Sequence, residues 1–110
     1  MNMSGSIIQC YGGASGSGIG QLSDPRHLAV DRHDNVLVAD YGNNRVLLLS
    51  SSLTHLGYII VPGHDLNGPT ALHLDVLTHR LYIGEYAGTG LVFVFGVDDS
   101  VLMSIVNSQR

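Results

Sequence analysis

The stretch Pro25-Arg26-His27-Leu28-Ala29-Val30-Asp31 recurs 44 residues later as Pro69-Thr70-Ala71-Leu72-His73-Leu74-Asp75, with proline, leucine, an aliphatic residue and aspartate in step. The match continues after a one-residue slip, because Val36-Leu37-Val38-Ala39-Asp40-Tyr41 corresponds to Leu81-Tyr82-Ile83-Gly84-Glu85-Tyr86 at an offset of 45. The slip falls in a polar turn, where one extra residue costs least. A period of about 40–50 residues built from short apolar runs is typical of a propeller blade or a similar repeat array.

Each repeat contains four short apolar runs, separated by polar or glycine-containing segments, and such runs predict β-strands. Val46-Leu47-Leu48-Leu49, which matches Leu91-Val92-Phe93-Val94 at the offset of 45, is apolar throughout and predicts a strand covered on both faces. We therefore predict an all-β fold, in which four-stranded antiparallel blades of a β-propeller stack on one another. The runs are His27–Asp31, Val36–Asp40, Arg45–Leu49 and Leu56–Val61 in the first repeat, and Ala71–Asp75, Leu81–Glu85, Leu91–Phe95 and Val101–Ile105 in the second.

The predicted domain spans residues 1–110, with one blade over 22–61, a second over 66–105, and a leading strand over 7–12 that belongs to the outer edge of a preceding blade. Two blades leave two apolar sheet faces without a partner. Two interpretations stay open: the chain is a fragment of a longer propeller, which we favour, or several copies assemble to complete a ring. The residues that we expect in the core are Val30, Val38, Leu47, Leu74, Ile83 and Phe93.

Residues 12–49 resemble an NHL repeat. The stretches Leu22-Ser23-Asp24-Pro25-Arg26-His27-Leu28-Ala29-Val30-Asp31 and Asn35-Val36-Leu37-Val38-Ala39-Asp40-Tyr41-Gly42-Asn43-Asn44-Arg45-Val46 follow that family's order of proline, alternating apolar residues, aspartate, turn, valine-alanine-aspartate and asparagine-asparagine-arginine-valine. The glycine-rich lead of the pattern corresponds to residues 12–22. The second repeat is similar but weaker, with Glu85 in place of the second aspartate and Gly88-Thr89-Gly90 in place of the asparagine-arginine turn.

The resemblance implies a partial NHL β-propeller, in a family whose rings usually have about six blades. Similar propellers recognise substrates for tripartite-motif ubiquitin ligases, so we predict a non-enzymatic scaffold or substrate-recognition module. Some relatives are metal-dependent enzymes similar to amidating lyases or lactonases, and others bind RNA. These two functions are the alternatives.

Six residues of the turns are the candidate binding residues, because loops on a rigid scaffold carry recognition and because arginine and tyrosine are frequent energetic anchors of interfaces. A structural role competes with this interpretation. Asn43 and Asn44 tolerate the positive φ of tight turns, and Arg45 is placed to pair with Asp40 across the turn. The candidates are Arg26, Tyr41, Asn43, Asn44 and Arg45 in the first repeat and Tyr86 in the second.

The charge balance favours a protein partner over a nucleic acid. Five arginines and no lysine stand against nine carboxylates, for a net charge of −4, whereas RNA and DNA binders usually carry a basic surface. No apolar run is long enough to span a membrane, and the first residues do not resemble a signal peptide, so we predict a cytoplasmic protein without membrane contact.

Histidine is the residue type that invites a metal interpretation, since the chain has six of them. None are spaced as a recognisable zinc set. His27 and His73 fall on the predicted innermost strands, which line the channel of a propeller, but a polar histidine at a strand end explains both. We therefore predict no metal site, no catalytic residue and no cofactor.

Overall fold

The computed structural model describes residues 4–59, 65–86 and 91–96, and these ranges contain β-strands and one 3-10 turn but no α-helix. Within them, no helix is long and apolar enough to cross a membrane. The all-β prediction is confirmed. The elements are β1 (Ala14–Ser15), β2 (Gln21–Leu22), β3 (Pro25–Val30), β4 (Val36–Asp40), η1 (Tyr41–Asn43), β5 (Arg45–Leu49), β6 (His55–Tyr58), β7 (Pro69–Asp75), β8 (Arg80–Glu85) and β9 (Val92–Gly96).

The first sheet has four strands in the order β3-β4-β5-β6, and every neighbouring pair is antiparallel. The pairing register runs from Leu28 to Val38 and from Val38 to Leu47, so these three side chains lie on one face. Asp31 ends the first of the apolar runs, and its Oδ1 accepts hydrogen bonds from the backbone N–H groups of His33 (2.8 Å) and Asn35 (2.9 Å). The strand order is that of a propeller blade, as predicted.

The second sheet contains β7, β8 and β9 in that order, again antiparallel. Its register pairs Leu72 with Ile83 and Ile83 with Phe93. The connection from β8 to β9 is therefore one residue longer than that from β4 to β5, and the third strand of the repeat corresponds at an offset of 46, not 45. The fourth strand predicted over Val101–Ile105 lies outside the described residues.

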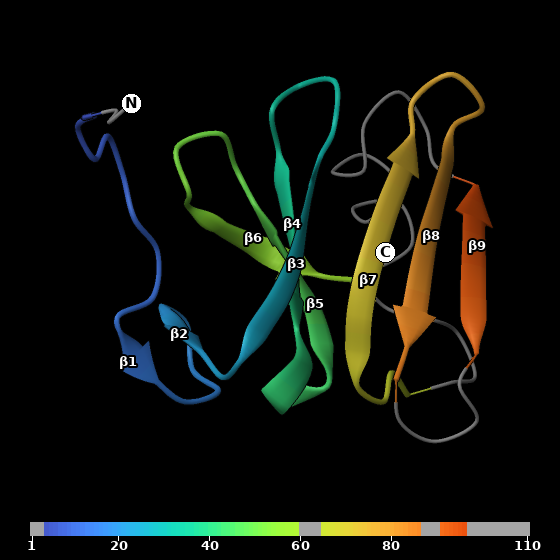
Figure 1. Ribbon diagram of the computed structural model, residues 1–110, viewed down its shortest axis with the longest axis horizontal. Helices are drawn as coiled ribbons and strands as arrows, with labels where there is room; N and C mark the ends of the chain where they lie inside the picture. Colours follow the sequence, from blue (N-terminus) through green and yellow to red (C-terminus); the bar gives the residue numbers. More distant parts are fainter. Residues whose placement is uncertain (1–3, 60–64, 87–90, 97–110) are drawn as a thin grey trace.

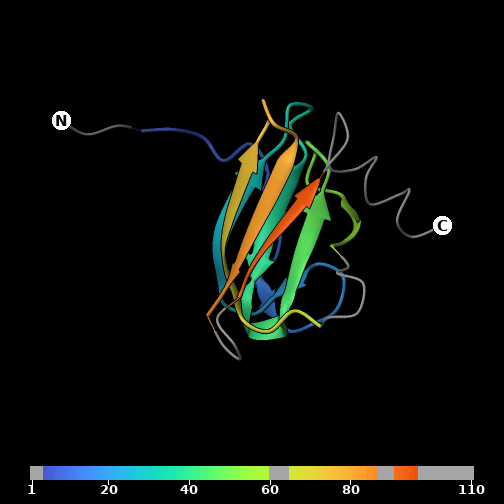
Figure 2. The ribbon, with the colours of Figure 1, turned by 90° about the vertical axis from the view of Figure 1, so that its right-hand side faces the viewer.

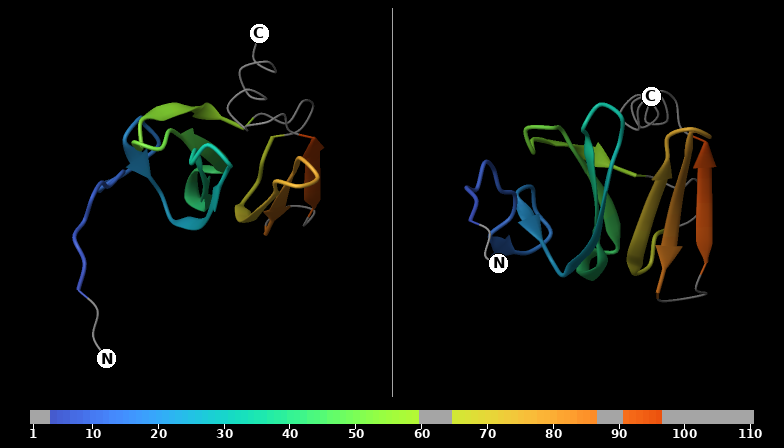
Figure 3. Two further views of the ribbon diagram at one scale, coloured as in Figure 1. Left: turned by 90° about the horizontal axis from the view of Figure 1, so that it is seen from above. Right: turned by 45° about the horizontal axis from the view of Figure 1, so that its top comes forward.

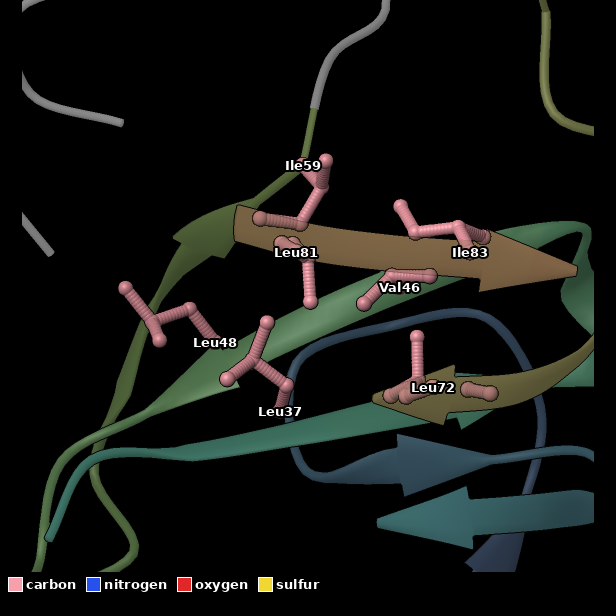
Figure 4. Packing of buried hydrophobic residues seen from close by; sticks show 8 residues of the cluster. Leu37, Val46, Leu48, Ile59, Leu72, Leu81 and Ile83 are labelled. Carbon is pink, nitrogen blue, oxygen red and sulfur yellow. The ribbon is translucent and has the colours of Figure 1, made fainter. Parts of the chain in front are cut away.

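The two sheets pack face to face, as Figure 1 and the orthogonal view in Figure 2 show. Alternate residues of β4 and β5 point toward the second sheet and meet alternate residues of β7 and β8 (Figure 4). The core between the sheets consists of Leu37, Ala39, Val46, Leu48 and Ile59 on one side and Leu72, Leu81 and Ile83 on the other. Face-to-face stacking of antiparallel sheets from successive repeats is the arrangement of neighbouring propeller blades.

The opposite face of the first sheet carries a second, smaller core of Val38, Leu47 and Leu49. The segment before the sheet covers part of this face, because Tyr11 and Leu22 pack against it. This segment contains the two-residue strands β1 and β2, which pair in parallel. Seen from above and at an angle, the N-terminal segment, the first sheet and the second sheet follow one another in a row (Figure 3).

The predicted core is correct in part. Val38 (3% exposed), Leu47 (0%) and Ile83 (0%) are buried, while Leu74 and Phe93 are partly buried against the core between the sheets. Val30 is 52% exposed, so its predicted burial is wrong. Val30 shares its face with the buried Val38 and Leu47, but it lies in the edge strand β3, outside the smaller core on which Tyr11 and Leu22 pack.

Residues 7–12, predicted as a strand of a preceding blade, have no regular structure here, and Ile7 and Ile8 are 87% and 91% exposed. A strand needs a neighbour with free backbone groups, and the neighbour expected for this segment is a blade outside the described ranges. The assignment of residues 7–12, like the limits of the two blades, therefore stays a prediction.

Candidate functional site

Five of the six candidate binding residues come from three places at one end of the molecule, the lower end in Figure 1. Tyr41 and Asn43 belong to η1, and Asn44 is the residue that caps its end. Arg45 begins β5, and Tyr86 follows β8. The sixth, Arg26, lies in β3 beside them. The structure divides the six residues into a partly buried hydrogen-bond network, a bridge between the sheets and a largely exposed cluster.

The network is built around Asp40, whose side chain is fully buried. Its Oδ1 accepts a hydrogen bond from the backbone N–H of Ser23 (2.7 Å). Its Oδ2 accepts from Asn43 Nδ2 (2.8 Å) and from Arg45 Nε (3.0 Å). A buried carboxylate is stable only when its oxygens are paired in this way, so Asn43 and Arg45 compensate the burial of Asp40.

The same two side chains hold the glycine-rich segment in place. Arg45 donates from Nη1 to the carbonyl of Ser17 (2.7 Å) and from Nη2 to the carbonyl of Gln21 (2.8 Å), and Asn43 Nδ2 donates to the carbonyl of Gly16 (2.7 Å). Because their polar groups are directed into the molecule, Asn43 and Arg45 have the geometry of structural residues. We call Asp40, Asn43 and Arg45 the turn clamp.

Gly42 completes the turn clamp for a steric reason. Its N–H donates to the carbonyl of Ser23 (2.7 Å), which brings the two backbones together. A Cβ at position 42 would lie 2.3 Å from that carbonyl oxygen, a distance that no side chain tolerates. The glycine of the turn is thus required by the close approach of the segment that precedes β3.

Asn44 bridges the two sheets. It adopts the left-handed conformation (φ 54°) at the end of η1, so of the two asparagines that tolerate positive φ, Asn44 is the one that uses it. Its Oδ1 accepts a hydrogen bond from the backbone N–H of Gly68 (2.8 Å), the residue before β7. The turn of the first sheet is thereby joined to the entry of the second.

Arg26 and Tyr86, which are exposed, and Tyr41, which is half-buried, form the third group. The guanidinium carbon of Arg26 lies 4.0 Å from the ring centroid of Tyr41, a cation–π contact. The rings of Tyr41 and Tyr86 meet edge to face with centroids 6.2 Å apart, so the cluster spans both sheets. Tyr86 is 72% exposed. We call these three residues the aromatic cluster.

Asp24 completes the electrostatics of this cluster. Its Oδ2 accepts from Arg26 Nε (3.1 Å) and Nη2 (2.9 Å) in an exposed ion pair. The hydrogen bond to Asp24 is the main cause that raises the pKa of Arg26 above its usual value. The guanidinium is thus cationic but charge-compensated, and its carbon lies over the Tyr41 ring.

The second repeat uses a different side chain for part of the turn clamp. Glu85 is 8% exposed, and its Oε2 accepts a hydrogen bond from the backbone N–H of Asn67. Asn67 lies 44 residues after Ser23, so this bond is the repeat equivalent of the one from Ser23 to Asp40. The repeat aligns Glu85 with Asp40, but the sequence alone does not predict that both carboxylates accept a hydrogen bond from the backbone of the preceding segment.

Two histidines of the innermost strands have structural partners. The backbone N–H of Leu72 donates to His27 Nδ1 (2.8 Å), a bond between β3 and β7 that sequence analysis did not predict. The ring of His73 lies 5.9 Å from that of Tyr82. Within the described ranges, no three His, Cys, Asp or Glu side chains converge as metal ligands would.

Comparison with known proteins identifies one stretch of the chain. The family model described as NHL repeat matches residues 22–47. The matched residues run from the end of β2 into β5, and they include all of the turn clamp together with Arg26 and Tyr41. No curated protein matches the chain.

Proposed function

Since residues 22–47 are an NHL repeat, we propose that the chain is a non-enzymatic protein-interaction module and that it presents the aromatic cluster to a protein partner. The observation that supports this best is the exposure of Tyr86 (72%) beside Arg26 and Tyr41. Tyrosine and arginine are, with tryptophan, the side chains most enriched among the energetic anchors of interfaces. An aromatic surface of this kind is what a protein partner would use.

Hydrogen bonds that hold the backbone at Tyr41 and Tyr86 in place support the proposal. Tyr41 begins η1, and the turn clamp fixes the other end of that turn through Asn43. Tyr86 is held by the hydrogen bond from its N–H to the carbonyl of Gly68 (2.8 Å), which lies beside Asn44. Side chains that are positioned before binding lose less conformational entropy when a partner arrives.

The chemistry of the cluster defines the segment that it would recognise. The faces and edges of two tyrosine rings suit an aliphatic or aromatic side chain, and the guanidinium of Arg26 suits a carboxylate that replaces or joins Asp24. We therefore propose a partner segment with an apolar side chain next to an acidic one. In the cell this would be the recognition of a substrate or scaffold protein, as in tripartite-motif ligases with NHL propellers, in the cytoplasm.

The test uses a displayed library of peptides that is selected for binding to the full chain. Selected peptides should pair an apolar with an acidic residue, and Tyr86→Ala or Arg26→Ala should weaken their binding by about tenfold or more. Leu77→Ala is the matched control, because Leu77 is 88% exposed in the turn between β7 and β8, away from the cluster. Peptides whose affinity is unchanged by both cluster variants would contradict the proposal.

A further inference from the structure

The first sheet exposes the face that we call its leading face, which points away from the second sheet. Leu28 and Val30 of β3 are 61% and 52% exposed on it. Val38 and Leu49 lie deeper and belong to the smaller core. A groove of about 580 Å³ runs over this face, with an apolar lining that includes Tyr11, Leu22, Leu28, Val36, Val38 and Leu49.

The repeat shows what such a face does when it has a partner. The residues that correspond to Leu28, Val36 and Val38 are Leu72, Leu81 and Ile83 in the second repeat. Leu72 (4% exposed), Leu81 (0%) and Ile83 (0%) are buried against the first sheet. The leading face of the second sheet is therefore an inter-sheet contact surface, and the leading face of the first has the same pattern.

The segments that precede the two sheets correspond as well. Leu66 lies 44 residues after Leu22 and packs against the core between the sheets. Leu22 packs against the smaller core of the leading face in the same manner. Leu22 therefore borders the groove as Leu66 borders the contact between the two sheets.

The opposite face of each sheet is called its trailing face. The trailing face of the second sheet points away from the first sheet, and its residues match those that bind a leading face. On the first sheet, the trailing face contributes Val46 and Leu48, which are 0% exposed because the second sheet covers them. The corresponding residues of the second sheet are Val92 and Val94, at 66% and 53% exposure. Each copy of the chain therefore carries one leading face and one trailing face with exposed apolar residues.

We propose that a second copy of this chain docks its trailing face on the leading face of the first copy, so that the contact repeats the one between the two sheets. This occupant explains both exposed faces at once, whereas a small ligand in the groove would leave Val92 and Val94 exposed. The association is head to tail, which closes into a ring if the rotation allows and otherwise continues as an open stack. Propeller rings contain about four to eight blades, so about two to four copies would close one.

Two substitutions at the trailing face make this contact weaker than the internal one. Ala71 stands in place of His27, so the bond that Leu72 N–H makes with His27 inside the chain has no counterpart between copies. Tyr82 stands in place of the smaller Leu37, so the side chains must pack differently. We therefore expect reversible assembly that depends on protein concentration. The groove shares Arg26 with the aromatic cluster, but the proposal does not rest on the binding function proposed for that cluster.

The test measures molar mass by light scattering across a roughly hundredfold range of protein concentration. The parent chain should exceed its monomer mass of 11.7 kDa increasingly as concentration rises. Leu28→Asp on the leading face and Val94→Asp on the trailing face should each give monomers. A mixture of the two variants should form dimers and nothing larger, since each variant retains the face that the other lacks.

Leu77→Asp, on neither face, is the control and should assemble like the parent. Circular dichroism checks that the variants fold, and Leu28→Ser with Val94→Ser replace any that do not. A parent chain that is monomeric at every concentration would overturn the proposal and assign the leading face to another occupant. So would assembly that survives either face variant, or a mixture that stays monomeric.

Discussion

The turn that ends β4 and the turn that ends β8 occupy the same place in two repeats, yet they are built differently. In the first, Asp40 joins Ser23, Asn43 and Arg45 in one network. In the second, Glu85 keeps the bond to the backbone of the preceding segment, and the asparagine-arginine sequence is absent. Both turns therefore need a carboxylate that accepts a hydrogen bond from the segment before the first strand of the sheet. In the first repeat, the arginine and the asparagine also hold the glycine-rich segment in place.

The largest effect should come from Asp40→Ala. This change removes the acceptor for Ser23 N–H and leaves the partly buried Arg45 side chain without its carboxylate. Loss of one partner of a buried ion pair costs about 3–5 kcal/mol in the free energy of unfolding. Urea unfolding followed by circular dichroism measures the loss, and a change below about 1 kcal/mol would show that the turn clamp contributes little.

Glu85→Ala should have a smaller effect and thereby sharpen the comparison. The backbone N–H of Asn67 would lose its acceptor, a cost of about 1–3 kcal/mol for a buried donor. Glu85→Gln is the matched control, because the amide oxygen can still accept that hydrogen bond. If Glu85→Ala destabilises as much as Asp40→Ala in the same urea assay, the two turns are equivalent after all.

His27→Ala should lower stability by about 1 kcal/mol, the usual net contribution of one hydrogen bond. The bond from Leu72 N–H to His27 Nδ1 connects the two sheets without belonging to either turn. Its loss should speed amide exchange at Leu72 while exchange at the strand pairs within the first sheet stays unchanged. Equal acceleration in both sheets would indicate that the repeats unfold only as one unit.

The smallest effect concerns the aspartates that end the first apolar run of each repeat. Asp31 is buried (5% exposed), whereas Asp75 accepts from Leu77 N–H and Thr78 N–H at the surface. Hydrogen bonds from Thr78 are the main cause that lowers the pKa of Asp75 below its usual value. Its contribution is therefore present above the pKa of the unfolded chain and fades as pH falls through the lower folded value. A carboxyl titration by NMR that places Asp75 at or above an ordinary aspartate would contradict this.

Strand positions could be predicted from the sequence because each run carries its own signals. Proline begins two strands, aspartate ends three apolar runs, and leucine and valine supply most of the other residues, so β4 and β5 begin and end where the runs do. For the third strand of the second repeat, the sequence predicts Leu91–Phe95, whereas β9 spans Val92–Gly96. Leu91-Val92-Phe93-Val94 is apolar in every register, and only pairing with β8 fixes which side chains face the core.

The division of the candidate site could not be predicted, because it depends on where neighbouring turn residues point. Asn43 and Asn44 are adjacent and chemically identical, yet one holds the glycine-rich segment and the other the second sheet. The contact of Tyr41 with Tyr86 requires the two sheets to be stacked, a long-range event that no local pattern encodes. That these turn residues bind a partner stays a prediction, and the packing decides which of them lie at the surface.

The most direct test of this division measures, on the same samples, the affinity for a selected peptide and the free energy of unfolding of two variants. Asn43→Ala removes donors to Asp40 and Gly16, so it should lower the free energy of unfolding by about 1–2 kcal/mol while the affinity of the folded protein stays close to that of the parent. Tyr86→Ala should do the reverse, weakening binding about tenfold or more with the free energy of unfolding nearly unchanged. If Tyr86→Ala instead unfolds the protein and Asn43→Ala abolishes binding without loss of stability, the assignment of the turn clamp and the aromatic cluster is wrong.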